Sequence, residues 1–294
     1  MHKSGFVNIV GNPNVGKSTL MNTLVGERIS IITSKAQTTR HRIMGIVNGE
    51  DFQIVYSDTP GVLKPNYKLQ ESMLGFSTSA LKDADILLYV TDTVENGMKN
   101  SDFIEKVKKQ HAPVLLIINK IDLTDQQKLE ALVAQWKEIL PNAEIIPVSA
   151  ANKFNIDYVL KRIKDLLPEC PPYFEKDALT DKPARFFVTE IIREKILTNY
   201  DREIPYAVEV VVEQFKESDD LIRINAVINV ERDTQKGIII GKGGKMLKIV
   251  GTEARKDIEA FFGKKVFLEL FVKVEKDWRN KEMKLKSFGY DADI

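Results

Sequence analysis

A glycine-rich stretch near the start of the chain, GNPNVGKS, constrains the fold more than any other feature of the sequence. Gly11 and Gly16 flank four residues, Lys17 and Ser18 follow, and an apolar run at residues 6–10 comes directly before. Glycines here let the backbone turn so that its N–H groups converge on phosphate oxygens, and the start of a helix adds its positive dipole end. Lys17 would reach the terminal phosphates, and Ser18 would offer a hydroxyl to Mg²⁺. The sequence therefore predicts a phosphate-binding loop between a strand and a helix. The residues expected to form it are Gly11, Asn12, Pro13, Asn14, Val15, Gly16, Lys17, Ser18 and Thr19.

Short apolar runs alternate with segments of helical periodicity through the first half of the chain. This alternation predicts an α/β domain with a mostly parallel sheet and helices on both faces. In such sheets, ligands bind at the carboxyl ends of the strands. The expected strands are residues 6–10, 45–47, 52–56, 86–91, 114–119 and 144–148, and the expected helices include 126–140 and 156–167.

A proline-rich segment ends this pattern near Leu167. We therefore predict a first domain at residues 1–168, a linker at 169–183, a second domain at 184–280 and a tail at 281–294. The second domain has the element order α-β-β-α-α-β, which predicts an α+β fold with an antiparallel component. Its expected elements are helix 184–200, strands 206–216 and 221–233, helix 245–262 and strand 266–274.

Asn119, Lys120 and Asp122 follow the expected strand at residues 114–119, at the edge of the sheet where ligands bind. A carboxylate at Asp122 can accept two hydrogen bonds from guanine, which adenine cannot supply, and unpaired buried polar groups are costly. Ser149 and Ala150 end another expected strand and would close over the base with backbone N–H groups. These residues predict that the phosphate loop binds GTP and GDP.

A second phosphate-side motif, DTPG, contains Asp58 and Gly61. Asp58 is expected to hold Mg²⁺ through water together with Ser18, and the Gly61 N–H to contact the γ-phosphate. A threonine upstream of this motif would complete the Mg²⁺ shell only while the γ-phosphate is present, which makes a hydrolysis-sensitive switch. We prefer Thr39 to Thr38 for this role. The expected metal ligands are Ser18, Thr39 and Asp58.

In this order, the motifs resemble those of translation-factor-class P-loop GTPases over residues 4–167, and the resemblance implies hydrolysis of GTP to GDP. Ras-like proteins carry a water-orienting glutamine directly after Gly61, where this chain has Val62. We therefore expect slow intrinsic turnover that a partner or a second cation accelerates. In GTPases that resemble this one, an asparagine at the position of Asn14 helps to hold K⁺; the alternative is that Asn14 only caps the turn. The residues expected to act in hydrolysis are Lys17, Thr39, Gly61 and Asn14.

A GXXG loop, Gly241 to Gly244, joins two helical segments in the second domain, and Lys245 follows it. In KH domains this loop lets the nucleic-acid backbone approach closely. Residues 231–286 carry 15 Lys and Arg against 9 Asp and Glu, a net charge of +6 in a chain whose net charge is +1. The strand pair before the loop resembles the type II KH arrangement, which implies single-stranded RNA bound with an affinity that falls as salt rises. The expected RNA-binding residues are Gly241, Lys242, Gly243, Gly244 and Lys245.

A GTPase domain followed by one type II KH domain resembles the Era family of bacterial GTPases over nearly the whole chain. The stretches QTTRHR at 37–42, YDREIPY at 200–206 and VEKDWR at 274–279 support the resemblance. It implies binding to small-subunit ribosomal RNA near its 3′ end, a role in assembling the small ribosomal subunit, and partial association with the inner membrane surface. We expect Arg40 and Arg42 to be solvated or to face RNA, with arginine fingers in cis as the alternative.

Bulk properties narrow the remaining choices. No stretch approaches the ~18–20 apolar residues of a membrane span, and the start of the chain lacks a signal-peptide pattern. The single cysteine, Cys170, permits no internal disulfide, so we expect a cytoplasmic protein, and nothing in the sequence suggests more than a monomer. The alternative function is a GTPase whose C-terminal domain binds a protein or membrane partner, which the GXXG loop and the positive charge beside it argue against. Asn119 and Asp122 argue against a metabolic kinase.

Overall fold

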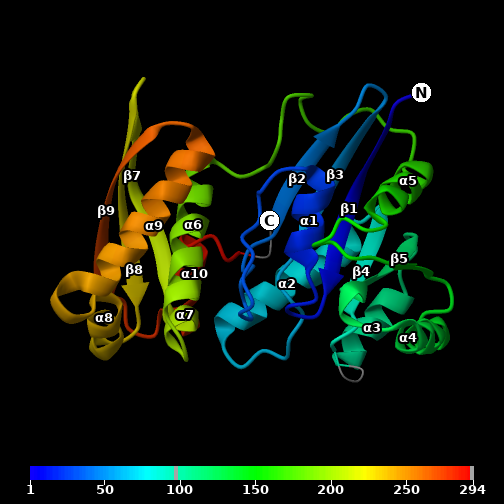
Figure 1. Cartoon of the computed structure of the whole chain (residues 1–294), viewed down its shortest axis with the longest axis horizontal. Helices are drawn as coiled ribbons and strands as arrows, with labels where there is room; N and C mark the ends of the chain where they lie inside the picture. The colour runs from blue at the N-terminus through cyan, green and yellow to red at the C-terminus, as the bar shows by residue number, and fades with distance from the viewer. Residues whose placement is uncertain (96–98, 292–294) are drawn as a thin grey trace. The chain divides into compact units, whose positions relative to one another are not determined.

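The computed structural model describes residues 1–95 and 99–291, which divide into two compact units (Figure 1). The first unit holds Met1–Asn66 and Gln70–Asp181, and the second holds Tyr67–Leu69 and Lys182–Asp291. Within the described residues, no helix combines the length and the apolar character that crossing a membrane requires.

The first unit is built on a six-stranded sheet with the order β2-β3-β1-β4-β5-β6. All neighbouring strands are parallel except the pair β2 and β3, which is antiparallel. This topology confirms the predicted mostly parallel sheet and brings the carboxyl ends of β1, β3, β4 and β5 to one edge. The strands are β1 (Lys3–Gly11), β2 (Ile43–Asn48), β3 (Phe52–Asp58), β4 (Ile86–Asp92), β5 (Val114–Asn119) and β6 (Glu144–Pro147).

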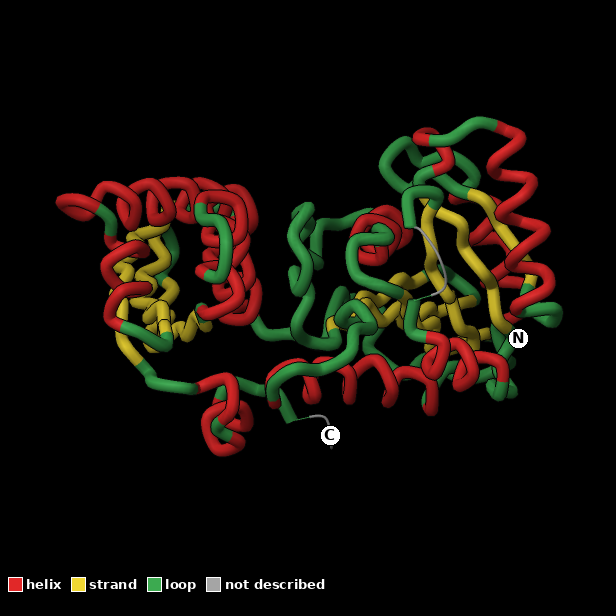
Figure 2. Tube along the Cα trace, turned by 90° about the horizontal axis from the view of Figure 1, so that it is seen from below, coloured by secondary structure: helices red, strands yellow, loops and turns green. Residues whose placement is uncertain are grey.

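Helices lie on both sides of this sheet (Figure 2). One apolar core joins side chains of α2, α3 and α4 to strands β1, β4 and β5, with Tyr89 and Trp136 packed ring against ring. The strands are apolar on both faces because both faces are covered. The helices of the unit are α1 (Lys17–Val25), α2 (Lys68–Lys82), α3 (Ser101–Lys108), α4 (Gln126–Ile139) and α5 (Ile156–Leu166), with a 3₁₀ turn η1 (Ile121–Leu123).

The proline-rich segment after α5 is hydrogen-bonded to the first unit. Glu169 forms a bridge with Lys3, and Thr180 forms one with Gly45 on the edge strand β2. The buried Gln53 side chain donates to Phe174 O at 2.8 Å. These bonds run along the segment as far as Asp181, so this part of the chain packs with the first unit.

The second unit is a three-stranded sheet, β7-β8-β9, with helices packed on one face. Strands β7 and β8 are antiparallel, and β8 and β9 are parallel. The even-numbered residues of β8 face the core, as their period of two predicts. The order α-β-β-α-α-β is confirmed, with the short α7 as an addition. The elements are α6 (Ala184–Asn199), α7 (Ile204–Ala207), β7 (Glu209–Glu217), β8 (Leu221–Val230), α8 (Asp233–Ile240), η2 (Lys242–Gly244), α9 (Lys245–Phe262), β9 (Lys265–Val274), η3 (Trp278–Asn280) and α10 (Glu282–Ser287).

Candidate functional site

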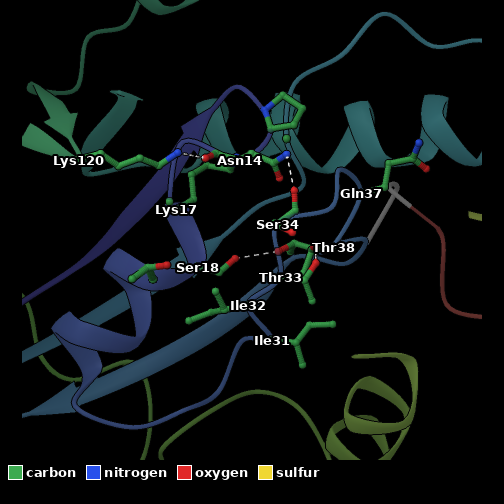
Figure 3. A pocket seen from close by; sticks show the side chains of 15 residues that line it. Asn14, Lys17, Ser18, Ile31, Ile32, Thr33, Ser34, Gln37, Thr38 and Lys120 are labelled. Carbon is green, nitrogen blue, oxygen red and sulfur yellow. Dashed lines mark hydrogen bonds between the residues drawn. The ribbon is translucent and has the colours of Figure 1, made fainter. Parts of the chain in front are cut away.

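The glycine-rich loop runs from the end of β1 to the start of α1 and borders a cavity of about 390 Å³ (Figure 3). Gly16 has φ +92°, and a Cβ atom there would lie 2.2 Å from Asn119 Nδ2. At Gly61 a Cβ atom would lie 2.6 Å from Pro13 Cα. Only glycine fits these two places, because the loop backbone meets its neighbours without a gap.

Lys17 is buried at the first turn of α1, and its Nζ donates to the carbonyl oxygen of Asn12 at 2.7 Å. Burial lowers the pKa of Lys17 to about 8, and the charges of Asp58 and Glu95 offset part of this effect. A desolvated ammonium group among backbone N–H groups forms strong charge-assisted bonds with an anion. The loop is therefore suited to phosphate.

Three oxygen-bearing side chains meet beside Lys17. Ser18 Oγ donates to Asp58 Oδ2 at 2.6 Å and lies 2.9 Å from Thr39 Oγ1, which is itself 3.4 Å from the same carboxylate oxygen. Asp58 Oδ1 is buried and has no hydrogen-bond partner among the residues that the structure describes. Burial raises the pKa of Asp58, partly offset by the bond from Ser18 and the charge of Lys17. Hard oxygen donors with a free lone pair fit Mg²⁺ and its bound waters.

The two threonines considered for the switch differ in their surroundings. Thr39 is buried at the oxygen cluster. Thr38 Oγ1 donates instead to Lys35 O at 2.6 Å and lies 2.6 Å from Thr33 Oγ1. The geometry therefore favours Thr39 as the metal-side threonine.

The residues expected to select guanine differ in role: Asn119 links two loops of the site, and Asp122 is exposed where a base can bind. The Asn119 side chain donates to Val15 O at 2.9 Å and accepts from the Ala150 N–H at 3.0 Å, so it ties the phosphate loop to the loop after β6. Asp122 is exposed and accepts from Ser149 Oγ at 2.5 Å, which leaves it accessible to a base. The N–H of Ala150 is engaged with Asn119, so its contact with the base stays a prediction.

Lys120 follows β5 and connects the phosphate loop with the end of β4. Its Nζ donates to Asn14 O at 2.5 Å and to Asp92 Oδ2 at 2.6 Å. It therefore anchors the phosphate loop to the end of β4.

The cavity is lined by part of the predicted set and by further residues that the predicted nucleotide site did not include. Predicted residues that line it are Pro13, Asn14, Gly16, Lys17, Ser18, Thr19, Thr39, Gly61 and Lys120. Predicted residues outside its lining are Gly11, Asn12, Val15, Asp58, Asn119, Asp122, Ser149 and Ala150. The additional lining residues are Ile31, Ile32, Thr33, Ser34, Gln37 and Thr38. Gln37 and Thr38 belong to the quoted stretch QTTRHR, and Thr38 was the alternative switch threonine. The other four are marked in the sequence only by their position between the phosphate loop and Thr39.

A pair of side chains after β4 braces the site, and sequence analysis missed both. Asn100 Nδ2 donates to Asn12 Oδ1 at 2.7 Å and to Val62 O at 2.8 Å, and Glu95 Oε1 accepts from Asn12 Nδ2 at 2.7 Å. The Val62 N–H in turn bonds Gly11 O at 3.1 Å. The backbone after Gly61 is thus fixed to the phosphate loop on two sides.

The expectation that Arg40 and Arg42 are solvated or face RNA is wrong for this structure. Arg40 is fully buried. Arg42 forms a bidentate pair with Asp83, at 2.7 and 3.0 Å, and also donates to Ser57 Oγ and Asn8 Oδ1. These bonds tie the start of β2 to the end of α2, so Arg42 is not placed as an arginine finger.

Asn14 has φ +64°, and its side-chain amide donates to Ser34 O at 3.0 Å (Figure 3). The bond joins the phosphate loop to the segment that carries Thr39. It supplies a structural role for Asn14 alongside the expected role at a cation.

The GXXG loop joins α8 to α9, as predicted. Gly243 and Gly244 have φ +60° and +77°, and a Cβ atom at either would meet no atom of the described chain within 4 Å. Their surface is therefore open to a ligand. Beside the loop, α9 and β9 border a groove of about 380 Å³. It is lined by Gly244, Leu247, Lys248, Gly251, Thr252, Arg255, Leu268 and Leu270, of which only Gly244 was predicted.

Comparisons with known proteins agree with both units. The family described as 50S ribosome-binding GTPase matches residues 6–120, and the KH domain family matches residues 203–279. The GTPase Era of Staphylococcus haemolyticus (strain JCSC1435) is 46% identical over 294 residues, which cover 99% of this chain and 98% of that protein.

Two solved structures are similar over their full length. The crystal structure of Era in complex with MgGDPNP and nucleotides 1506–1542 of 16S ribosomal RNA has 38% identity and a TM-score of 0.94, with 99% of each chain covered. That of an Aquifex aeolicus Era variant bound to GDP·AlF4⁻ has 39% identity and a TM-score of 0.92, with 98% of this chain and 99% of that chain covered. With a phosphate-loop GTPase unit and a KH unit in one chain, the protein belongs to the Era family of GTPases.

Proposed function

We propose that this chain uses GTP hydrolysis to control its binding to the 3′ region of small-subunit ribosomal RNA, and so assists assembly of the small ribosomal subunit. The observation that carries the proposal is that one chain holds both the Ser18–Thr39–Asp58 oxygen cluster and an open GXXG loop. The relatives solved with MgGDPNP and 16S ribosomal RNA and with GDP·AlF4⁻ support it.

In hydrolysis, the chain positions the phosphates and neutralises their charge. Lys17 and the loop N–H groups would hold the β- and γ-phosphate oxygens, and the Gly61 N–H would contact the γ-phosphate. Ser18, Thr39 and Asp58 would hold Mg²⁺, which when bound supplies positive charge that neutralises the phosphates. Loss of the γ-phosphate would remove the reason for Thr39 to stay at this cluster, and the segment that carries it would then be released.

The chain has no side chain at position 62 that can orient the water that attacks the γ-phosphate. Val62 is 3% exposed and apolar, and its backbone is fixed by Gly11 and Asn100. We infer slow turnover that a bound K⁺ accelerates. Asn14 and the Ser34 carbonyl lie together at the mouth of the phosphate loop and would supply oxygen ligands, which K⁺ accepts.

Single-turnover GTP hydrolysis in K⁺ and in Na⁺, with and without RNA from the 3′ end of the small-subunit ribosomal RNA, tests the enzymatic half of the proposal. We expect K⁺ to raise the wild-type rate at least about tenfold over Na⁺, through added positive charge at the phosphates. Asn14→Ala should lose this gain, so that its rates in K⁺ and in Na⁺ become equal. Equal rates in both salts would remove K⁺ from the mechanism, and bound GTP that is never hydrolysed would contradict the proposal.

The RNA half is tested by Gly243→Asp, which places a carboxylate where the RNA backbone approaches. We expect RNA affinity to fall by at least about tenfold, since a like charge at a phosphate contact is repulsive. Gly263→Asp is the matched control, because Gly263 has φ +66° and open space at the other end of α9. Equal affinity of both variants would exclude the GXXG loop as the RNA site.

We also propose a cytoplasmic monomer that contacts the inner membrane face only in part. Cell fractionation and sedimentation of the purified protein test these two points.

A further inference from the structure

We propose that the second unit carries another surface for single-stranded RNA, on the sheet face opposite its helices. The surface extends the binding site beyond the GXXG groove, and the inference therefore rests on the RNA-binding function proposed above. We call it the platform, and define it by the odd-numbered residues of β8 and β9 from 221 to 229 and from 265 to 273.

The two faces of this sheet differ in character. Even-numbered residues of β8 and β9 pack into the core with α6, α8 and α9. Odd-numbered residues point the other way, because side chains alternate along a strand. On that side Phe267 is 45% exposed and Phe271 is 53% exposed. Phenylalanine side chains are usually buried in the protein core. Two exposed rings on the same face of one strand therefore indicate a binding surface.

The parallel register of β8 and β9 places the residues of the platform in pairs across the two strands, and each pair forms one row. Arg223 pairs with Phe267, Asn225 with Glu269, Val227 with Phe271, and Asn229 with Lys273. Two ring rows thus alternate with two polar rows, and the rings lie ~13 Å apart along β9. Val227 and Asn229 on β8 are buried, so the last two rows are exposed only on the β9 side, at Phe271 and Lys273. This order gives stacking surfaces with hydrogen-bonding groups between them, as sheet-based readers of single-stranded RNA require.

Charge on the platform favours nucleic acid. Arg223, Lys265 and Lys273 are exposed cations, against one exposed carboxylate, Glu269. The Arg223 guanidinium lies 5.5 Å from the centre of the Phe267 ring. In the amide orientation that satisfies both groups, Asn225 donates to Glu269 Oε2 at 2.9 Å. Cations that track phosphates and rings that stack bases are the two parts of a single-strand site. Cores of protein interfaces, by contrast, are depleted of charge.

The platform is continuous with the groove through β9. This strand lies at the end of the sheet, and its Leu268 and Leu270 line the groove beside the GXXG loop. The neighbouring odd-numbered positions carry the two rings. A GXXG loop clamps about four nucleotides. A longer strand that leaves the groove across β9 therefore meets Phe267 and Phe271 on the other side.

RNA length separates the platform from the groove. The full chain is titrated with a tetranucleotide and with a twelve-nucleotide single strand from the 3′ end of small-subunit ribosomal RNA. The variant carries Phe267→Leu and Phe271→Leu, which keep apolar bulk and remove the rings. We expect the longer RNA to bind the variant at least about 5-fold more weakly than wild type, since base stacking is lost. Tetranucleotide affinity should stay within about twofold.

Two further variants sharpen the result. Phe267→Trp with Phe271→Trp should restore affinity for the longer RNA, because a ring returns. Lys265→Gln with Lys273→Gln should lower the salt dependence for the longer RNA by about one unit of slope. The proposal is overturned if the leucine variant loses nothing, loses equally at both lengths, or is not rescued by tryptophan. A platform that serves a protein partner would give the first of these results.

The outcome for the GXXG loop is read separately. Gly243→Asp should weaken both RNA lengths, whereas the leucine variant weakens only the longer. If wild type binds neither RNA, both proposals fail. If Gly243→Asp has no effect and the leucine variant does, the platform stands and the groove does not.

Discussion

The buried ammonium group of Lys17 lowers the free energy of unfolding of the protein. Burial lowers the pKa of Lys17 from 10.5 to about 8. Between these values the unfolded chain binds more protons at this side chain than the folded chain, so the free energy of unfolding rises with pH. The penalty is fully present below pH 8, amounts to about 3 kcal/mol, and disappears by pH 10.5.

Lys17→Met removes the ammonium group and keeps the length of the side chain. We expect nucleotide binding to be lost and the nucleotide-free protein to gain roughly 1–3 kcal/mol at pH 7, as the buried charge is gone. Chemical unfolding of both proteins at pH 7 and pH 10 measures the gap. The gap should shrink at pH 10, and a gap that stays constant would show that charge is not its cause.

Sequence motifs identify single residues well where the chemistry itself fixes them. Ser18 and Asp58 carry oxygen at motif positions, and the structure brings them to 2.6 Å. The bracing residues were not predictable in this way. Asn100 and Arg42 act through partners far along the chain, Val62 and Asp83, and only the strand order brings those pairs together.

At the scale of an element, α9 contains a glycine that its stability does not favour. Gly251 lies inside this 18-residue helix, where glycine costs about 0.5–1 kcal/mol relative to alanine. It lines the groove, and a Cβ atom there would lie 3.4 Å from Leu270 Cδ1, an ordinary contact. The helix therefore tolerates alanine, and the absent side chain leaves room in the groove.

We expect Gly251→Ala to stabilise the protein by about 0.5–1 kcal/mol through helix propensity. RNA affinity should fall at least about 5-fold, because the added methyl group would occupy space in the groove that the RNA fills when bound. Gly237→Ala on α8 is the matched control, since its Cβ atom would meet nothing within 4 Å. It should stabilise similarly and leave RNA affinity unchanged. Thermal unfolding measures the stability of both variants, and RNA titration measures their affinities. Equal RNA affinities of the two variants would contradict the role given to Gly251.

Elements with strong periodicity were predicted closely, and α9 begins and ends where the sequence places it. The start of β7 was not, because residues 204–207 form the short α7 around Pro205 before the strand begins. Proline near a helix start fixes φ at a helical value, which an apolar pattern alone does not reveal. The sheet order also depends on packing between distant runs, which no single run encodes.

At the scale of the whole molecule, the segment at residues 169–181 forms the last part of the first unit and is hydrogen-bonded to its edge strand β2. Thr180 Oγ1 donates to Met44 O at 2.6 Å, and the Met44 N–H donates to Asp181 Oδ1 at 2.9 Å. The Ile46 N–H donates to Leu179 O at 2.8 Å. This segment therefore covers part of the open edge of β2, which would otherwise expose unpaired backbone groups.

A first unit made as residues 1–181 should therefore be more stable than one made as residues 1–168. We expect a difference of about 2–4 kcal/mol, since several hydrogen bonds are lost and Gln53 loses the Phe174 carbonyl. Both fragments keep the phosphate loop, so both should bind GTP while folded, and neither should bind RNA. Chemical unfolding with and without GDP measures the difference. Equal stability would show that the segment adds nothing to the first unit, and the unit would then end at Pro168, where α5 has just stopped.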